Sequence, residues 1–158
     1  MNQALLFAEE TGCPLHFVHI SSAAAVERID RAKRQGLDVT LETCPHYLVL
    51  DEEDMGRIGT VAKCAPPLRS KDEQQKLWEV LEKGMIDMIS SDHSPCPTWM
   101  KTDYEEDIFK AWGGISGGQF SLEMMVDQGH IERNIPLTDI VKWLSANPAK
   151  RFGLYPQK

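Results

Sequence analysis

The sequence predicts an α/β fold, a partial TIM-like (β/α)8 barrel or an open parallel sheet. Short apolar runs alternate with longer amphipathic segments along the whole chain, the pattern expected of successive βα units. No linker, internal repeat or low-complexity tract interrupts this alternation. With 158 residues, 42% of them hydrophobic, the chain can bury one core. We therefore expect a single domain over residues 1–158.

The first unit is expected to end at a glycine. Residues 3–10 resemble the end of a helix, and residues 15–20 form an apolar run of strand length. Ser21 and Ser22 then precede the amphipathic segment 23–35, where a serine hydroxyl can accept a hydrogen bond from the first helical turn. Gly36 follows this helix and is expected to end it.

The second unit begins with a strand at 37–43. Asp51 should open a short acidic helix, in which the run DEED is a solvated helix start. Residues 61–63 resemble a short third strand. The segment 70–84 is the strongest helix prediction, since Ser70 and the glutamate three residues later form a capping-box pattern.

A buried strand is expected at 85–90, followed by a long segment of weak periodicity. This segment, residues 91–118, contains four glycines, and loops of such length in compact domains are often functional. Residues 121–129, 137–146 and 147–153 are expected to be helices that complete the core.

Composition excludes several classes of partner. A formal net charge of −7 disfavours nucleic-acid binding, because that affinity rests on clustered Lys and Arg. No apolar run approaches the roughly 20 residues that a membrane span needs, and the start lacks a secretory pattern. We therefore expect a cytoplasmic protein with a small-molecule ligand. The four cysteines form no CxxC pair, so reduced thiols are the simpler prediction.

Three side chains follow the ends of predicted strands. His19 ends the first strand, His46 follows the second in the run TCPH, and Asp92 follows the strand at 85–90. Functional residues of parallel βα folds lie where strands end and loops begin. Two imidazoles and a carboxylate at one rim suit a divalent metal of zinc type, which would acidify a bound water. Taken singly, each of the three is more often a structural residue than a ligand.

The other three histidines have different expected roles. His16 lies three residues before His19 and should face the opposite side of the strand, so both cannot be rim ligands. His93 could contact a ligand or substrate from a second layer, or be structural. His130, beside Gly129, is expected at the surface.

Taken together, four motifs resemble a known family. HFVHISS, ETCPHYLVL, KCAPPLR and DMISSDHSPCP occur in this order and are similar to the cyclic amidohydrolases, which include dihydropyrimidinases, hydantoinases, dihydroorotases and allantoinases. KCAPPLR, SDHSPCP and AWGGISGGQ look most like the allantoinase branch. The resemblance runs from about residue 4 to residue 154. It implies a metal-dependent hydrolase that opens allantoin to allantoate.

The resemblance also implies roles for the strand-end residues. Members of the family hold two divalent ions, usually zinc, with cobalt or manganese as alternatives, bridged by hydroxide and a carboxylated lysine. His19 and His46 would bind one ion, and Asp92 would bind the other and act as general base. The backbone at Ala65, and at Gly113 and Gly114, would bind a small cyclic ureide substrate. The family commonly forms homotetramers.

The sequence departs from the family at both ends. The HxH motif and the strand-borne lysine are absent, as is the stretch that follows Tyr155 in the family. The chain is thus similar to βα units 5 to 8 of a barrel of about 250 residues, truncated at both ends. We expect it to be inactive alone, with unpaired strand edges and an open apolar inner face. Alternative functions are a hydantoinase or dihydropyrimidinase acting on a related ring, and a non-catalytic assembly module.

Overall fold

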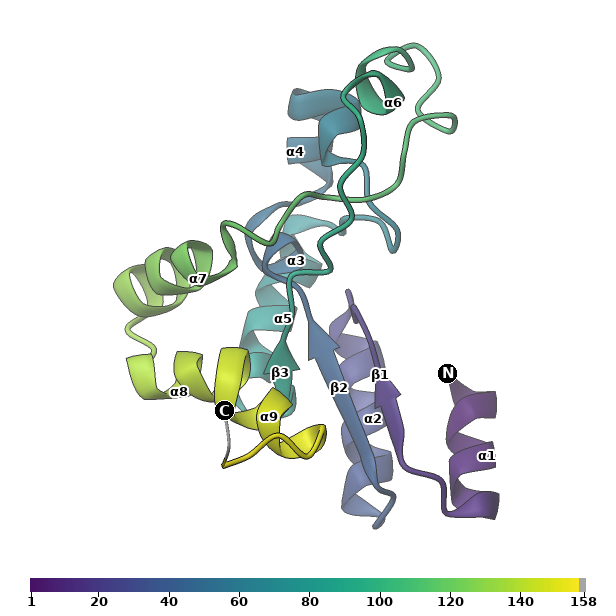
Figure 1. The fold of residues 1–158 in the computed structure, drawn as a ribbon, viewed down its shortest axis with the longest axis vertical. Coiled ribbons are helices and arrows are strands. Elements are labelled where there is room, and N and C mark those ends of the chain that lie inside the picture. The colour runs from purple at the N-terminus through teal and green to yellow at the C-terminus, as the bar shows by residue number, and fades with distance from the viewer. Residues whose placement is uncertain (157–158) are drawn as a thin grey trace.

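A computed structural model describes residues 1–156 and confirms the α/β class. Three strands form one parallel sheet in chain order: β1 (Leu15–Phe17), β2 (Val39–Thr43) and β3 (Met88–Ile89). Leu15 pairs with Val39, and Thr43 pairs with Ile89. Because the strands are parallel, their carboxyl ends meet at one edge of the sheet, the upper edge in Figure 1.

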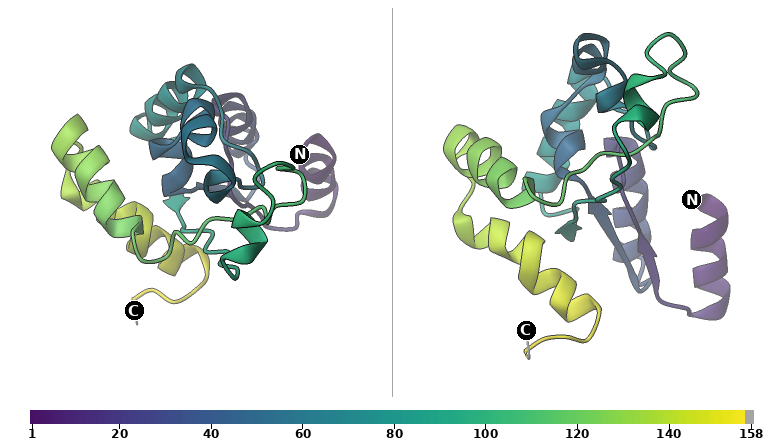
Figure 2. Two further views of the ribbon diagram at one scale, coloured as in Figure 1. Left: turned by 90° about the horizontal axis from the view of Figure 1, so that it is seen from above. Right: turned by 45° about the horizontal axis from the view of Figure 1, so that its top comes forward.

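Helices cover one face of this small sheet and extend beyond it. The α-helices are α1 (Asn2–Thr11), α2 (Ala23–Arg34), α3 (Pro45–Val49), α4 (Glu52–Ile58), α5 (Lys71–Glu82), α6 (Trp99–Thr102), α7 (Ser121–Met124), α8 (Leu137–Val141) and α9 (Asn147–Arg151). A 3-10 helix, η1 (Gly59–Ala62), and two π-helical segments, η2 (Met125–Ile131) and η3 (Lys142–Ala146), complete the set. Helices α2 and α5 lie behind the sheet in Figure 1, whereas α1 stands apart beside β1 (Figure 2).

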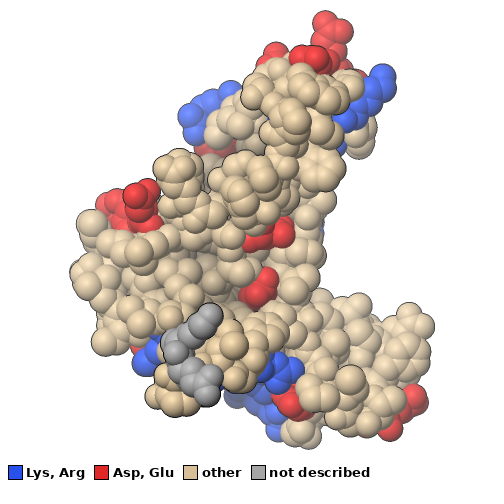
Figure 3. Space-filling model, in the orientation of Figure 1, with Lys and Arg blue, Asp and Glu red and all other residues tan. Residues whose placement is uncertain are grey.

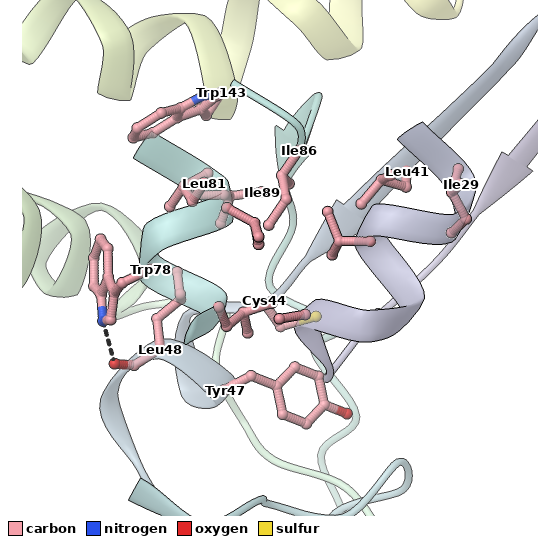
Figure 4. Close-up of a cluster of buried hydrophobic side chains, with 14 of the residues drawn as sticks. Ile29, Leu41, Cys44, Tyr47, Leu48, Trp78, Leu81, Ile86, Ile89 and Trp143 are labelled. Atoms are coloured by element: carbon pink, nitrogen blue, oxygen red, sulfur yellow. Dashed lines mark hydrogen bonds between the residues drawn. The ribbon is translucent and has the colours of Figure 1, made fainter. Parts of the chain in front are cut away.

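The core lies between the sheet and these covering helices. Ile29 of α2 and Leu41 of β2 are fully buried and face each other across this layer (Figure 4). Trp78 of α5 is also fully buried, and its indole Nε1 donates a 2.8 Å hydrogen bond to the carbonyl of Leu48. The guanidinium of Arg133 lies 4.2 Å from the centre of the same indole ring. Trp78 thus joins α5, α3 and the C-terminal helices.

Two of the predicted helix starts have the expected caps, and a third differs. The Ser22 hydroxyl accepts from Ala25 N–H, and Asp51 forms a complete capping box. Ser70 caps its helix, but the Glu73 carboxylate does not return to it. Instead, Glu73 accepts a 2.7 Å hydrogen bond from Ala23 N–H. This carboxylate therefore fastens α5 to the start of α2.

The predicted strand at 61–63 is wrong. The chain there ends the 3-10 helix η1, with Lys63 N–H bonded to the Thr60 carbonyl. Val61 is exposed, so its β-branched side chain had no buried sheet position to fill. The other strands are also shorter than expected, since pairing covers only parts of residues 15–20, 37–43 and 85–90.

The C-terminal helices are confirmed as helical, with differences in detail. The segments 121–131 and 137–151 are each continuous, and each passes through a π-helical stretch. His130 is not an exposed surface residue as expected. It is half-buried, and its Nδ1 lies 2.8 Å from the Ile135 carbonyl. All four cysteines are free, as predicted.

Replacing Trp78 with Phe should destabilise the chain by about 1–3 kcal/mol, because the Leu48 carbonyl loses its buried partner. Urea unfolding measures this change. Trp99→Phe is the matched control, since Trp99 is 54% exposed and its truncation should cost less than about 0.5 kcal/mol. Equal effects of the two substitutions would contradict the role assigned to Trp78.

Candidate functional site

The three residues predicted as ligands lie just beyond the strand ends. His19 comes two residues after β1, His46 lies in the first turn of α3 directly after β2, and Asp92 comes three residues after β3. His19 and Asp92 both have left-handed backbone conformations, with φ of 42° and 43°. Such conformations cost energy for residues other than glycine and often occur at functional sites. Two of them at one sheet edge mark this edge as the candidate site.

Thr43 holds the three strand ends together. Its side chain is fully buried, and its hydroxyl donates a 2.8 Å hydrogen bond to the Ile20 carbonyl, beyond β1. Its own carbonyl accepts from Ser90 N–H, just beyond β3. Thr43 also pairs with Ile89 in the ladder. The backbones that carry His19 and Asp92 are therefore fixed to the residue that ends β2.

His46 has the most unusual environment of the three. It is 3% exposed, and within residues 1–156 neither ring nitrogen has a hydrogen-bond partner. Its ring packs against that of Tyr47, with centroids 4.2 Å apart. Burial, and secondarily the charge of His19, lower the pKa of His46 to about 4. The imidazole is therefore neutral near pH 7, with a lone pair that no group in the described part of the chain uses.

The structure groups two of the three predicted ligands and adds a thiol. The ligand atoms of Cys44, His46 and Asp92 all lie within 4.8 Å of one another. His19 is not part of that group among the described residues, although its charge acts on His46. Burial, and then the carboxylate of Asp92, raise the pKa of the Cys44 thiol well above its ordinary value. Cys44 is thus protonated in the metal-free chain.

From the sequence, Cys44 is expected only to be a reduced thiol. The signal that could have identified it is its place in the run TCPH, directly at the end of β2 and two residues before His46. Figure 4 shows Cys44 among the buried side chains above Tyr47, inside the core rather than at the surface.

A polar network covers the sheet face opposite the helices. The Glu42 carboxylate accepts a hydrogen bond from the Ser90 hydroxyl and lies 3.1 Å from His16 Nε2. The other ring nitrogen of His16 lies 2.8 Å from the Thr40 hydroxyl. His16 is therefore engaged within the sheet, and that it is not a rim ligand stays a prediction. The network also restrains the chain two residues before Asp92.

The residues predicted to contact substrate lie in two adjacent segments. A β-carbon placed on Gly113 would lie 3.6 Å from Cβ of Ala65, so the two positions touch. Gly114 is buried, and an added β-carbon there would come within 2.7 Å of the Ser94 side chain. Its lack of a side chain is thus explained by packing. His93 forms a bridge with Ile115, and its Nδ1 accepts from Gly118 N–H.

A hollow lies beside the strand ends. Figure 3 shows the surface indented between the part of the molecule that contains α6 and the part that contains α1, and the floor is mostly uncharged. A shallow pocket near this edge is lined by His19, Ser21, Pro66 and Arg69, among others. Arg69 Nε donates to the Ser21 hydroxyl at 3.2 Å.

In the described residues, no helix is both long and apolar enough to cross a membrane.

Comparison with known proteins gives consistent matches along the whole chain. It is 52% identical over 158 residues to an allantoinase of Deinococcus radiodurans and 53% identical over 154 residues to an allantoinase of Bacillus velezensis. These matches cover 100% and 98% of the chain but only 35% and 33% of the two relatives. The chain thus spans about a third of the length of the curated relatives. No family model matches it.

Solved structures of hydantoinases are also similar to this chain. An L-hydantoinase (dihydropyrimidinase) from Arthrobacter aurescens superposes with a TM-score of 0.96 at 41% identity, covering 99% of this chain and 35% of that one. A D-hydantoinase (dihydropyrimidinase) from Thermus sp. gives a TM-score of 0.92 at 28% identity, with the same coverage. The resemblance to cyclic amidohydrolases, first seen in the motifs, is confirmed.

Thr43→Val should destabilise the chain by about 1–2 kcal/mol, because a near-isosteric side chain leaves the Ile20 carbonyl without its donor. Urea unfolding gives the free energy. Thr138→Val, at an exposed helical position, is the control and should be close to neutral. A Thr43 variant as stable as this control would contradict the role given to Thr43.

The pKa of His46 predicts a pH dependence of stability in the chelator-treated chain. Its folded-state pKa of about 4 lies below the ordinary value of 6.5, so the unfolded state binds more protons between those values. The free energy of unfolding should therefore rise from pH 4 to 6.5, and His46→Gln should remove up to about 3 kcal/mol of that rise. An unchanged pH profile in this variant would refute the assignment.

Proposed function

We infer that the chain, homologous along its whole length to one third of the allantoinases, is part of a metal-dependent cyclic amidohydrolase. The proposed reaction is hydrolysis of the hydantoin ring of allantoin to allantoate. The observation that carries the proposal is the sheet edge where His46 and Asp92 meet, flanked by His19 on a left-handed backbone. A fold resemblance alone would leave the chemistry open.

The donor set fits a zinc-type ion. His46 is buried with two unpartnered ring nitrogens, and an imidazole in that state is costly unless a ligand engages it. Asp92 supplies an oxygen donor within 4.8 Å of it. His19, which lies outside that group, would supply the further nitrogen that the family pattern implies. Borderline cations accept both donor types, so zinc fits, as do cobalt and manganese. Two ions are proposed for the whole enzyme, which needs ligands from outside these 158 residues.

Such an ion, when bound, would acidify a water for attack on the ring carbonyl. Asp92 would take the proton from the attacking water and deliver it to the leaving ring nitrogen. The left-handed backbone at Asp92, fixed by Ser94 N–H donating to the Ile115 carbonyl, keeps the carboxylate at the strand-end edge. His93 and its bond from Gly118 N–H support the same turn.

The ring of the substrate is proposed to be recognised by backbone groups of the adjacent Ala65 and Gly113 segments. A cyclic ureide presents alternating N–H and C=O groups, which peptide groups can match without side chains. In residues 1–156, no hydrogen bond engages the N–H groups of Ala65 or Gly113, so both are free for a ligand. Gly114 would act indirectly, by letting the loop approach Ser94.

Several properties of the whole protein remain proposals. The family pattern suggests a complete barrel, a homotetramer and a cytoplasmic location. That the chain corresponds to βα units 5 to 8 of such a barrel also stays a proposal, and the described residues 1–156 form a sheet of three strands. Because the chain spans a third of its relatives, we propose that it is inactive unless the remaining ligands are supplied.

A hydantoinase acting on a related ring is the nearest rival. Identity to the two allantoinases is 52% and 53%, against 41% and 28% to the two hydantoinases. Hydantoin, allantoin and dihydrouracil share the cyclic imide but differ in ring size and substituent, so relative kcat/KM values separate the candidates.

A chimera provides the direct test. This segment would replace the homologous third of the Deinococcus radiodurans allantoinase, and opening of allantoin would be measured with zinc, cobalt or manganese. We expect activity that a chelator removes. Asp92→Asn should lower kcat by about 10²–10⁴-fold with folding retained, because an amide cannot carry the proton. His19→Ala should lower the bound metal.

Asp103→Asn is the matched control, since Asp103 is an exposed carboxylate on the loop after α6. It should leave kcat unchanged. A folded chimera without turnover would favour the non-catalytic module, and a preference for hydantoin or dihydrouracil over allantoin would favour the rival enzymes.

A further inference from the structure

Lys101 is a buried cation whose partners among the described residues are backbone carbonyls. It is 8% exposed, and its ammonium donates to the carbonyls of Thr60, Val61 and Lys63 at 3.1, 3.3 and 2.7 Å. In return, the Thr60 hydroxyl donates to the Lys101 carbonyl at 2.9 Å. Burial lowers the pKa of Lys101. A buried ammonium is costly, so three carbonyl partners indicate a position that the fold has to keep.

Lys63 makes the reciprocal connection. It lies at the end of η1, two residues before Ala65, and its ammonium donates to the carbonyls of Phe109 and Ala111 at 3.1 and 2.5 Å. Ala111 directly precedes Trp112 and Gly113 in the loop after α6. Each of the two segments therefore contributes one lysine whose ammonium donates hydrogen bonds to backbone carbonyls of the other.

The two lysines bind close to the contact between Ala65 and Gly113, the positions whose backbone groups are proposed to bind the substrate. A β-carbon on Gly113 would lie 3.6 Å from Cβ of Ala65 and 4.0 Å from Cε of Lys63. Trp112 N–H also donates to the Met100 carbonyl, which ties this part of the loop to the turn that carries Lys101. The lysines take up carbonyls on both sides and leave the N–H groups of Ala65 and Gly113 free in the described residues.

We propose that Lys63 and Lys101 are positioning residues that fix the separation of the Ala65 and Gly113 backbones and so set the fit of the cyclic substrate. The substrate role rests on the proposed function. The hydrogen bonds from the Lys63 and Lys101 ammonium groups to backbone carbonyls, here called the clamp, are a property of this chain. Neither lysine needs to touch the substrate. Their effect is to hold peptide groups at fixed places before the ligand arrives, which reduces the ordering that binding would otherwise require.

The clamp is tested first in the 158-residue chain, by hydrogen exchange of the peptide covering residues 109–114. Lys63→Met should speed exchange there by about tenfold or more, because hydrogen bonds from a charged group are lost. Lys110→Met is the matched control, since the exposed Lys110 lies in the same loop and, within residues 1–156, its ammonium pairs with the partly buried Asp107 carboxylate at 3.2 Å. Equal exchange in the two variants would overturn the clamp.

The substrate role is tested in the chimera with allantoin. Lys63→Met should raise KM by about three- to tenfold with kcat changed by less than about twofold, Lys63→Arg should restore much of the loss, and Lys110→Met should match the wild type. An unchanged KM in the Lys63→Met chimera would overturn the positioning role. Lys101→Met is expected to have the same direction of effect.

Failures of the two proposals are distinguishable. An inactive but folded wild-type chimera counts against the proposed function, and the exchange measurement still decides the clamp. An active chimera in which Lys63→Met behaves like Lys110→Met counts against the clamp and leaves the proposed function standing.

Discussion

The site depends on one buried threonine. Thr43 ends β2 and bonds both to the chain beyond β1, through its hydroxyl, and to the chain beyond β3, through its carbonyl. The ladder between β2 and β3 covers only two residue pairs, so strand pairing alone gives the third strand little support. Thr43 compensates by fixing the turns that follow the strands. Because His19 and Asp92 sit in those turns on left-handed backbones, this residue maintains their strained geometry.

Two further layers of contacts brace the same edge from opposite sides. On the sheet face away from the helices, Glu42 holds Ser90 and His16. Above the edge, lysine-carbonyl bonds join the segment around Ala65 to the loop before Gly113. The strand-end residues are thus held by side chains that do not themselves carry the proposed chemistry, which is how a geometry needed for catalysis is kept rigid.

Sequence patterns predicted those features, such as helix caps and strand ends, that depend on residues close together in the chain. Ser22 and Asp51 cap their helices because cap preference depends on a few neighbouring residues, and the strand-end positions of His46 and Asp92 followed from the apolar runs before them. Residues 61–63 were assigned wrongly because exposed β-branched residues have no intrinsic need of a sheet. The Glu73 bond to Ala23 could not be foreseen, since it joins positions 50 residues apart. The place of Cys44 at the end of β2 could be read from the run TCPH, but its closeness to Asp92 could not, because those two residues are far apart in the sequence.

The open side of the sheet differs from what a partial barrel suggested. An exposed apolar inner face was expected, yet β1 and β2 present His16, Thr40 and Glu42 there, and these side chains bond to one another. Such a face tolerates water, so it supplies little hydrophobic force for association. The backbone at the edge of the sheet, unlike these side chains, can still accept a partner. Within residues 1–156, β1 pairs only with β2, which leaves its other edge free for a parallel strand. A further strand would therefore add to this sheet chiefly through backbone hydrogen bonds at the free edge of β1, more than by covering an apolar face.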